Sequence, residues 1–479
     1  MTLQPCILDE IVRLRKQDIA HEKQQQSQHT VKAQITASQR DFYGVLTAKK
    51  AANQPIFILE CKKASPSKGR IRENFDVASI VQSYRPYATV ISVLTEQRHF
   101  QGEFHYLTTA AHACNKPILC KDMIIDAYQI EKARRYGADA VLLMLSILSD
   151  AEYRAFAALA HELQMGVLTE VTNANEVVRA VALGAKVIGI NNRNLQDLSI
   201  DITRTAQLSP LIPPSCIVIS ESGIVDNSAL AELRPYADGF LIGSALMAQA
   251  SLDLAVRKLL IGAHKVCGIT TPKDAQAAYE AGAAFGGLIF VKTSPRAVSL
   301  NAAREIVQST PLAFIGVFQN DAIATVVTTA TELNLDAIQL HGSESVPYIQ
   351  TLRRALPAKV RIIKTLAFPN DNTLPKVSCD LLALKAQGEI SHFLLDSQSG
   401  GSGQPFNWAL LTQTPFRELL KTSFLAGGIN QHNLAQAQSL GAYGIDINSG
   451  AEIVPGKKEA AKLAALFKII SSMTVGAKQ

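Results

Sequence analysis

The chain has 479 residues, of which 47% are hydrophobic and 18% are charged, and its formal net charge is +6 at pH 7. A chain of this length is too long for a single hydrophobic core, so we expect two domains. The small positive charge permits the binding of anionic substrates and gives no support to nucleic-acid binding. No run of about 18 apolar residues occurs, so we expect no membrane span.

The N-terminal residues and the cysteines indicate the compartment. Residues 1–20 have the pattern of a charged amphipathic helix, so we expect no secretory signal. The 7 cysteines are scattered and contain no CxxC pair, which is typical of free thiols in a reduced cytoplasm. The sequence has no P-loop, no His/Cys cluster and no dinucleotide-binding GxGxxG motif, so we expect neither a cofactor nor a metal. We expect a monomer that binds phosphorylated small molecules, with no nucleic-acid or membrane partner.

Eight apolar runs follow one another in the first half, with segments of helical pattern between them, as in a (β/α)8 barrel. Most are continuously apolar rather than alternating, which is typical of parallel strands buried on both faces. They comprise residues 56–62, 88–95, 116–123, 138–145, 165–171, 186–193, 216–222 and 237–244. Residues 1–52 precede the first run, and we expect them to form extra helices beside the barrel mouth.

The second half repeats this order, and residues 380–386 are the only candidate for the helix after its fifth strand. Its apolar runs comprise residues 264–270, 285–291, 312–318, 335–342, 359–368, 392–397, 423–429 and 443–450. The predicted fold class is α/β, with two tandem (β/α)8 TIM barrels, the first with extra N-terminal helices. We place the domains at residues 1–261 and 262–479, because residues 251–264 have the pattern of a last helix that runs directly into the next strand.

Each half ends with two strands that stop at glycine and serine. They lie within residues 216–224 and 239–247 in the first half, and within 423–430 and 443–452 in the second. Such a strand end leaves backbone N–H groups unobstructed for an anion, and the last two strands of a TIM barrel frequently supply a phosphate site. We expect the second strand of each pair to lead into a helix. Each barrel is therefore predicted to bind a phosphorylated small molecule.

Charged side chains gather at the strand ends of the first half. Two lysines and three glutamates end apolar runs there, namely Glu60, Lys62, Lys121, Glu170 and Glu221. Because residues two apart share one face of a strand, Glu60 and Lys62 should both point into the barrel. A single charge at a strand end is ordinary solvated surface. Five at one rim indicate a site in which charges of both signs supply an acid and a base.

The first half resembles indole-3-glycerol phosphate synthase over nearly all of residues 1–255. The motifs that carry the resemblance are ILECKKASPSKG, SVLTEQRHFQG, PILCKDMIIDAYQI, GVLTEV, IGINNRNL, ISESGI and GFLIGSALM. The resemblance implies a carboxyphenylamino-deoxyribulose phosphate as the substrate. The aryl carbon attacks a ketone, CO2 leaves, and water is eliminated to form the indole.

The same resemblance implies roles for single residues. Lys121 matches the general acid, and we expect neighbouring cations to lower its pKa, so that it donates a proton near pH 7. Glu170 and the Lys62–Glu60 pair match the dehydration groups, whose division of roles stays open, and Lys62 is also placed for the substrate carboxylate. Asn191, Arg193 and Glu221 match orienting groups. Phosphate and substrate contacts are implied for Ser65, Ser222, Gly223, Gly243 and Ser244.

Two positions depart from this family pattern. Met123 stands where phenylalanine is usual, and it keeps an apolar wall. Asn194 stands where aspartate is usual, so the orientation of Arg193 should depend on another partner.

The second half places Cys267, His341 and Asp396 at the ends of its first, fourth and sixth strands, and Arg296 follows its second. Taken alone, a cysteine beside glycine is more often a small buried hydrophobic residue. This half, however, resembles phosphoribosylanthranilate isomerase across residues 262–470. The motifs are KVCGIT, GGLIFVKTSPR, IQLHG, FLLDS with GGSGQPFNW, LAGGIN and DINSGAE.

That resemblance implies an Amadori rearrangement, with Asp396 as the general acid at the ring oxygen and Cys267 as the general base. The thiolate of Cys267 must then be favoured by nearby N–H groups or cations. Arg296 suits the anthranilate carboxylate, which an arginine can hold with two hydrogen bonds. His341 is either a polar group that contacts substrate or a structural hydrogen-bonding group.

The phosphate loops of this half also follow from the resemblance. They match Gly427, Gly428, Ser449 and Gly450, and Asn448 departs from the usual serine. The glycine-rich residues 397–408 suit a loop that closes over a ligand.

Two alternative functions fit the sequence less well than the synthase and the isomerase. A non-catalytic sensor of phosphorylated ligands would need the phosphate loops but not Lys121, Glu170, Cys267 or Asp396. A sugar-phosphate isomerase like that of histidine biosynthesis would use paired aspartates in the second barrel, where the first strand offers Cys267 instead.

Overall fold

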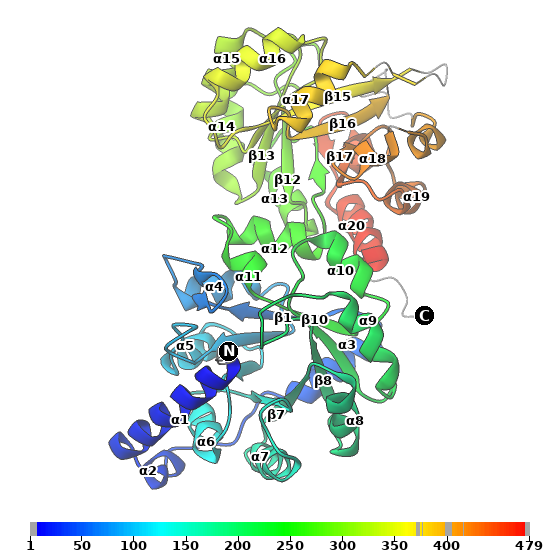
Figure 1. Ribbon diagram of the computed structural model, residues 1–479. Helices are drawn as coiled ribbons and strands as arrows, with labels where there is room; N and C mark the ends of the chain where they lie inside the picture. The colour runs from blue at the N-terminus through cyan, green and yellow to red at the C-terminus, as the bar shows by residue number, and fades with distance from the viewer. Residues whose placement is uncertain (1–6, 370–373, 376, 398–404, 415, 475–479) are drawn as a thin grey trace, which may run out of the picture. The chain divides into compact units, whose positions relative to one another are not determined.

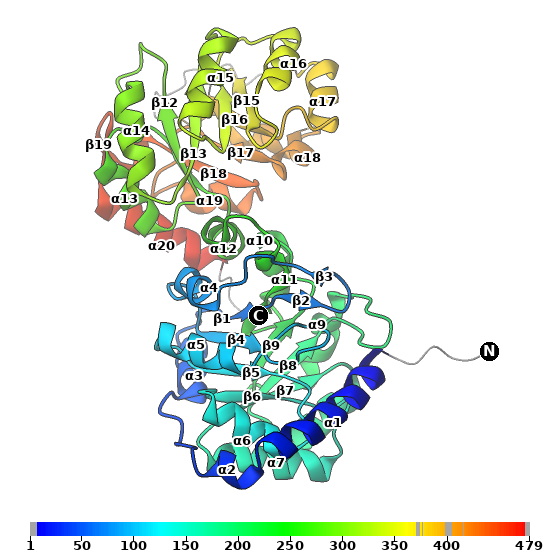
Figure 2. The ribbon, with the colours of Figure 1, turned by 90° about the vertical axis from the view of Figure 1, so that its left-hand side faces the viewer.

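The computed structural model describes residues 7–369, 374–375, 377–397, 405–414 and 416–474. These residues fall into two compact units, 7–256 and 257–474, and the division lies within helix α12 (Leu252–Leu260). Each unit contains a closed barrel of eight parallel strands with helices around it (Figures 1 and 2). The predicted pair of TIM barrels is therefore confirmed.

The barrel of the first unit closes because β1 pairs in parallel with both β10 and β4. Its strands are β1 (Ile56–Cys61), β4 (Val90–Leu94), β5 (Ile118–Lys121), β6 (Ala140–Met144), β7 (Gly166–Val171), β8 (Val187–Asn191), β9 (Ile217–Glu221) and β10 (Gly239–Ile242). The core inside them includes Ile58, Leu142 and Leu168, which are buried. All eight strands fall within the predicted apolar runs.

The helices of the first unit follow the strands in sequence. They are α4 (Val77–Tyr84), α5 (His105–Ala113), α6 (Ala127–Arg135), α7 (Asp150–Glu162), α8 (Ala174–Ala182), α9 (Thr203–Leu208), α10 (Asn227–Leu233) and α11 (Ser244–Met247). Several begin at a side chain that caps the helix. Ser149 and Asp126 each form a reciprocal capping box with the residue three positions on.

The N-terminal segment forms three helices, α1 (Ile7–Gln25), α2 (Gln28–Lys32) and α3 (Phe42–Ala51). Leu8 and Ile11 of α1 reach the mouth of the barrel, as expected. α3 lies instead at the opposite end of the strands from the hairpin of β2 (Ala64–Ser65) and β3 (Gly69–Arg70) (Figure 2). Only glycine fits at position 166, because a Cβ there would lie 2.2 Å from the ring of Phe42. The expectation that residues 1–52 gather beside the mouth is therefore wrong for α3, whose apolar side chains fill the amino end of the barrel.

The barrel of the second unit closes through parallel pairing of β11 with β12 and β18. Its strands are β11 (Lys265–Val266), β12 (Phe285–Ile289), β13 (Ala313–Phe318), β14 (Ala337–Leu340), β15 (Arg361–Phe368), β16 (His392–Ser397), β17 (Ser423–Leu425) and β18 (Gly444–Ile447). Its helices are α13 (Pro272–Ala281), α14 (Leu300–Ser309), α15 (Ile323–Glu332), α16 (Val346–Ala355), α17 (Cys379–Ala386), α18 (Phe416–Leu420), α19 (Leu434–Ser439) and α20 (Ala460–Thr474). The predicted helix after the fifth strand is confirmed as α17.

The segment after β18 differs from the prediction of a helix. A single 3-10 turn, Ser449–Ala451, is followed by a hairpin of β19 (Glu452–Val454) and β20 (Lys457–Lys458), and α20 begins only at Ala460. The hairpin forms because Glu452 is held by Arg296 and Lys458, and because Gly456 turns the chain at φ +84°. By contrast, Ser244 does begin a short helix in the first unit.

Among the described residues, no helix combines the length and the apolar composition needed to cross a bilayer.

Candidate functional site

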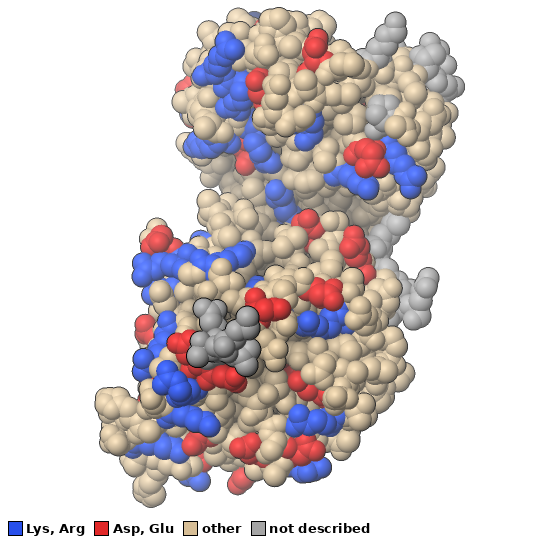
Figure 3. Space-filling view, viewed as in Figure 1, with Lys and Arg blue, Asp and Glu red and all other residues tan. Residues whose placement is uncertain are grey.

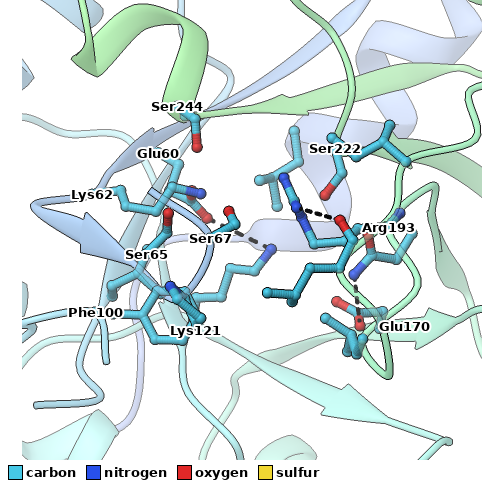
Figure 4. Close-up of a pocket in the computed structure, with 18 of the residues that line it drawn as sticks. Glu60, Lys62, Ser65, Ser67, Phe100, Lys121, Glu170, Arg193, Ser222 and Ser244 are labelled. Atoms are coloured by element: carbon cyan, nitrogen blue, oxygen red, sulfur yellow. Dashed lines mark hydrogen bonds and ion pairs between the residues drawn. The ribbon is translucent and has the colours of Figure 1, made fainter. Parts of the chain in front are cut away.

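The first unit has a cavity of about 170 Å³ at the carboxyl ends of its strands. Figure 4 shows the side chains around it, with Lys121 extending toward Glu60. The site residues predicted from the sequence that line it are Glu60, Lys62, Ser65, Lys121, Glu170, Asn191, Arg193, Ser222, Gly223, Gly243 and Ser244. Glu221 does not line the cavity but contacts Lys121, which does. The structure therefore brings together the residues that the sequence analysis selected from six strands and their loops.

Lys121 lies between two carboxylates from other strands. Its Nζ is 2.8 Å from Glu221 Oε2 and 3.6 Å from Glu60 Oε2, and Glu60 Oε1 is in turn 2.5 Å from Lys62 Nζ. Burial alone would lower the pKa of Lys121, but Glu221, Glu60 and Glu170 together raise it well above its ordinary value. The expectation of a lowered pKa is therefore wrong, because the neighbours of this lysine are mainly anions.

Glu170 holds its proton more strongly than an ordinary glutamate. Burial, together with the negative charge of Glu221, raises its pKa from 4.5 to about 7, although Lys121 and the hydrogen bond from Asn191 act in the opposite direction. Asn191 Nδ2 donates that bond to Glu170 Oε1 at 3.1 Å. Near neutral pH, Glu170 can therefore either give or accept a proton.

Arg193 is held without an aspartate at position 194. Its Nη1 donates to the carbonyl of Leu198 at 2.9 Å, and its backbone N–H donates to Asn191 Oδ1 at 3.0 Å. Asn194 instead accepts from the backbone of Gln196 and shapes the loop. Because position 194 is not an aspartate, Arg193 was expected to have another partner, and the carbonyl of Leu198 is that partner.

The predicted phosphate loops of the first unit lie beside these charges. Ser222 and Gly223 have φ values of +66° and +81°, and Ser244 is the first residue of α11. A Cβ at Gly243 would lie 2.3 Å from Glu60 Oε1, so this glycine lets Glu60 pass close to the backbone. A larger residue at position 243 would displace Glu60 as well as any anion.

Two supporting contacts were not found from the sequence. Glu96 accepts the backbone N–H groups of Arg98, His99 and Phe100, which closes the loop that brings Phe100 to the cavity. Arg15 of α1 donates through Nε and Nη2 to Asp122, the residue after Lys121. The only signal available was the charge pattern of each segment, which does not tell which distant residue it meets.

The second unit places Cys267, Asp396 and His341 around the carboxyl end of its barrel. Burial raises the pKa of Asp396 from 3.8 to about 6, helped by the charge of Asp446. Cys267 is buried, and burial raises the pKa of its thiol above the ordinary value, although Lys265 acts in the opposite direction. His341 Nε2 is 3.9 Å from Asp396 Oδ2.

His341 makes structural hydrogen bonds within the second unit. Its Nδ1 is 3.1 Å from Gln339 Nε2 and 3.0 Å from Thr365 Oγ1, which fixes the ring. With the Gln339 amide as donor, Nδ1 is an acceptor and the ring proton lies on Nε2, toward Asp396. Burial lowers the pKa of His341 to about 4, so the ring is neutral near pH 7.

Arg296 is engaged by Glu452 rather than being wholly available to a substrate. Its Nε and Nη2 donate to the two carboxylate oxygens at 2.9 and 2.8 Å. Lys458 donates to Glu452 and also to Asn448 Oδ1 at 2.9 Å. The unusual Asn448 is thus part of a buried network that includes Arg296.

The remaining predicted residues form the loops after β17 and β18. Gly427 and Gly428 have φ values of +88° and +61°. A Cβ at Gly450 would lie 2.1 Å from the carbonyl oxygen of Ile429, so the two loops touch at this glycine, next to Ser449. The glycine-rich loop predicted to close over a ligand falls largely at residues 398–404, which lie outside the described residues.

Comparisons with known proteins identify the family of each half of the chain. The model of the family "Indole-3-glycerol phosphate synthase" matches residues 8–259, and that of "N-(5'phosphoribosyl)anthranilate (PRA) isomerase" matches residues 264–469. The tryptophan biosynthesis protein TrpCF of Yersinia pestis is 48% identical over 464 residues, which are 97% of this chain and 94% of that protein. TrpCF of Salmonella typhi is 50% identical over 448 residues, 94% of this chain and 95% of that protein.

The chain belongs to the TrpCF family. It is a bifunctional enzyme of tryptophan biosynthesis that catalyses both the synthase and the isomerase reactions, and the hypothesis of a non-catalytic sensor is not supported. Among solved structures, phosphoribosyl anthranilate isomerase from Thermus thermophilus is 31% identical, with 44% of this chain and 98% of that chain covered and a TM-score of 0.38.

The raised pKa of Glu170 predicts a pH-dependent change in stability. Because the folded state holds this proton more tightly than the unfolded chain, the ionised group destabilises the first unit above pH 7, and the penalty disappears as the pH falls toward 4.5. Glu170→Gln should therefore raise the free energy of unfolding by up to about 3 kcal/mol at pH 8 and by little at pH 5.

Urea unfolding followed by circular dichroism measures this effect. The single tryptophan, Trp408, lies in the second unit, so its fluorescence separates the transition of that unit. Glu162→Gln, at an exposed position of the first unit, is the matched control. A gain in stability that is equal at pH 5 and pH 8 would contradict the assigned protonation of Glu170.

Proposed function

We propose that the first unit closes the indole ring with Lys121 at the ketone oxygen. The observation that carries this proposal is the position of the Lys121 ammonium at the cavity, between Glu221 and Glu60. With a raised pKa, Lys121 is charged in essentially every molecule at neutral pH. Its first contribution is to stabilise the negative charge that develops on the oxygen, and the proton follows as that oxygen becomes more basic.

Glu170 and the Lys62–Glu60 pair serve the dehydration in this proposal. A carboxyl group with a pKa of about 7 is close to the best compromise between holding a proton and releasing it at neutral pH. Lys62 lies at the cavity, where its ammonium suits the substrate carboxylate before CO2 leaves. Asn191 and Arg193 orient Glu170 and the adjacent loop, and Ser65, Ser222, Gly223, Gly243 and Ser244 hold phosphate and substrate.

In the second unit, we propose Asp396 as the acid at the ring oxygen of the aminofuranose and Cys267 as the base at carbon 2. A pKa of about 6 keeps part of Asp396 protonated near neutral pH, and the Nε2–H of His341 faces the carboxylate that forms. Phosphate is held by the loops of Gly427, Gly428, Ser449 and Gly450. Arg296 holds the anthranilate carboxylate through Nη1 alone, because Nε and Nη2 already donate to Glu452. It does not form a bidentate contact with the substrate.

We also propose how the chain is divided into domains, where it acts and which partners it lacks. We propose domains at residues 1–261 and 262–479 and a monomer in the cytoplasm. The six cysteines of the described region are free thiols, which fits a reducing compartment. On the face of the first unit shown in Figure 3, lysine and arginine side chains are interspersed with aspartate and glutamate, rather than forming the basic stripe typical of nucleic-acid binding.

The two activities should be lost separately. Lys121→Met should lower kcat/KM for indoleglycerol phosphate formation by about 10²–10⁴-fold and leave the isomerase unchanged, and Asp396→Asn should do the reverse. Each variant is the control of the other, and steady-state assays with each substrate measure both. If either variant lost both reactions while remaining folded, the assignment of one acid to each barrel would be wrong.

A charge placed at Ser222 tests the phosphate site of the first unit. Ser222 has a positive φ of +66°, a conformation that both aspartate and asparagine tolerate. Ser222→Asp should raise the KM of the synthase at least about tenfold, because a carboxylate would then face the phosphate. Ser222→Asn has the same size without the charge, and it should change KM much less. Equal effects of the two variants on KM would show that phosphate does not bind at this loop.

A further inference from the structure

We propose that Lys265 is the positioning residue that sets the ionisation of Cys267, and that Asp446 opposes it from the neighbouring strand. The working base of the isomerase is then a buried ammonium–thiolate pair rather than a lone cysteine. This inference rests on the proposed role of Cys267 as the base.

The strand register places the two side chains together. Lys265 and Cys267 are two residues apart where β11 ends, so they point to the same face. On the adjacent strand β12, a Cβ at Gly287 would lie 2.8 Å from Cys267 Sγ and 2.9 Å from Lys265 Cε. The sulfur and the end of the lysine side chain therefore both pack against Gly287. The absence of a side chain at this glycine makes room for both groups.

Lys265 has no solvent to compensate its charge. Its side chain is 0% exposed, and its Nζ is 2.8 Å from Asp446 Oδ2 on β18. The other oxygen, Asp446 Oδ1, is buried and has no hydrogen-bond partner within the described region. A buried ammonium needs counter-charges, and the two groups that act most strongly on Lys265 in this way are Asp446 and the ionisable thiol of Cys267.

Other charged groups around Cys267 act on the same equilibrium. Lys458 of β20 and Arg296 after β12 add positive charge, whereas Asp446 adds negative charge. Asp396 of β16 and the neutral ring of His341 also belong to this site. Burial raises the pKa of the thiol, Lys265 is the largest influence that lowers it, and Asp446 raises it. Lys265 and Asp446 therefore act on Cys267 in opposite directions.

This arrangement gives the proton transfer a clear course. The thiolate accepts the proton from carbon 2 as the C–H bond breaks and the S–H bond forms. The electron pair of the broken C–H bond forms a double bond between carbon 2 and carbon 1. The protonated imine nitrogen thereby becomes a neutral amine. Lys265 keeps its own proton throughout, because neighbouring anions raise its pKa well above the ordinary value.

The rate of alkylation of Cys267 by iodoacetamide, followed over pH in the full-length protein, measures the pKa of the thiol. Mass spectrometry of the peptide that contains Cys267 distinguishes it from the other cysteines. Lys265→Met should raise this pKa by about one unit or more, and Asp446→Asn should lower it, because each change removes one of two opposite charges. The pH at which kcat/KM of the isomerase rises should move in the same two directions.

Lys364→Met is the matched control, because Lys364 of β15 is also a buried lysine of this barrel but pairs with Glu344. It should leave the pKa of Cys267 unchanged. Trp408 fluorescence checks that the second unit is folded, and if Lys265→Met does not fold, Asp446→Asn still carries the test. The inference would be overturned if the pKa of Cys267 were unchanged in both Lys265→Met and Asp446→Asn, or if it moved in the same direction in both.

Cys267→Ala separates this inference from the proposed function. If Cys267→Ala kept full isomerase activity, the base would be misassigned, although the effect of Lys265 on the thiol could still be measured. If Cys267→Ala abolished the isomerase activity, the assignment of Cys267 as the base would be supported. If the pKa of Cys267 were nevertheless unchanged in Lys265→Met and Asp446→Asn, the inference about Lys265 would fail.

Discussion

A lysine ammonium that a barrel shields wholly or largely from water must be compensated by a carboxylate, and both sites depend on this requirement. In the first unit, Lys121 of β5 meets Glu221 of β9, which is 100 residues away in the sequence. In the second, Lys265 of β11 meets Asp446 of β18, 181 residues away. A closed parallel barrel brings such residues together because all of its strands end at the same rim.

The pairing of buried charges also decides which groups hold a proton. In the first unit, Lys121 is compensated mainly by Glu221 and Glu60, whereas Glu170 is fully buried and lies near the charge of Glu221. Its pKa rises accordingly. In the second unit, Asp396 is buried near Asp446, and Lys265 acts on both carboxylates. In each barrel, a buried carboxyl group with a raised pKa, Glu170 or Asp396, can therefore exchange a proton near neutral pH.

The sequence predicted the strands and the residues at their ends, because barrel strands are buried on both faces and therefore form continuous apolar runs. Glu60, Lys121 and Glu170 could be found as charges that end such runs. The pKa direction of Lys121 could not, because it depends on which side chains from other strands come closest. For the same reason, neither the contact of Glu452 with Arg296 nor the packing of Phe42 against Gly166 could be predicted. Local sequence shows that a residue is charged or apolar, but not which distant partner it meets.

Burial beside other carboxylates raises the pKa of Glu170 and of Asp396 toward neutral pH. Carbon-13 NMR of protein labelled at its aspartate and glutamate carboxyl groups measures this directly, with Glu170→Gln and Asp396→Asn assigning the two signals. We expect Glu170 to titrate with a pKa of about 7 and Asp396 with a pKa of about 6. Titration of both at their ordinary values of 4.5 and 3.8 would show that burial does not strengthen the binding of these two protons.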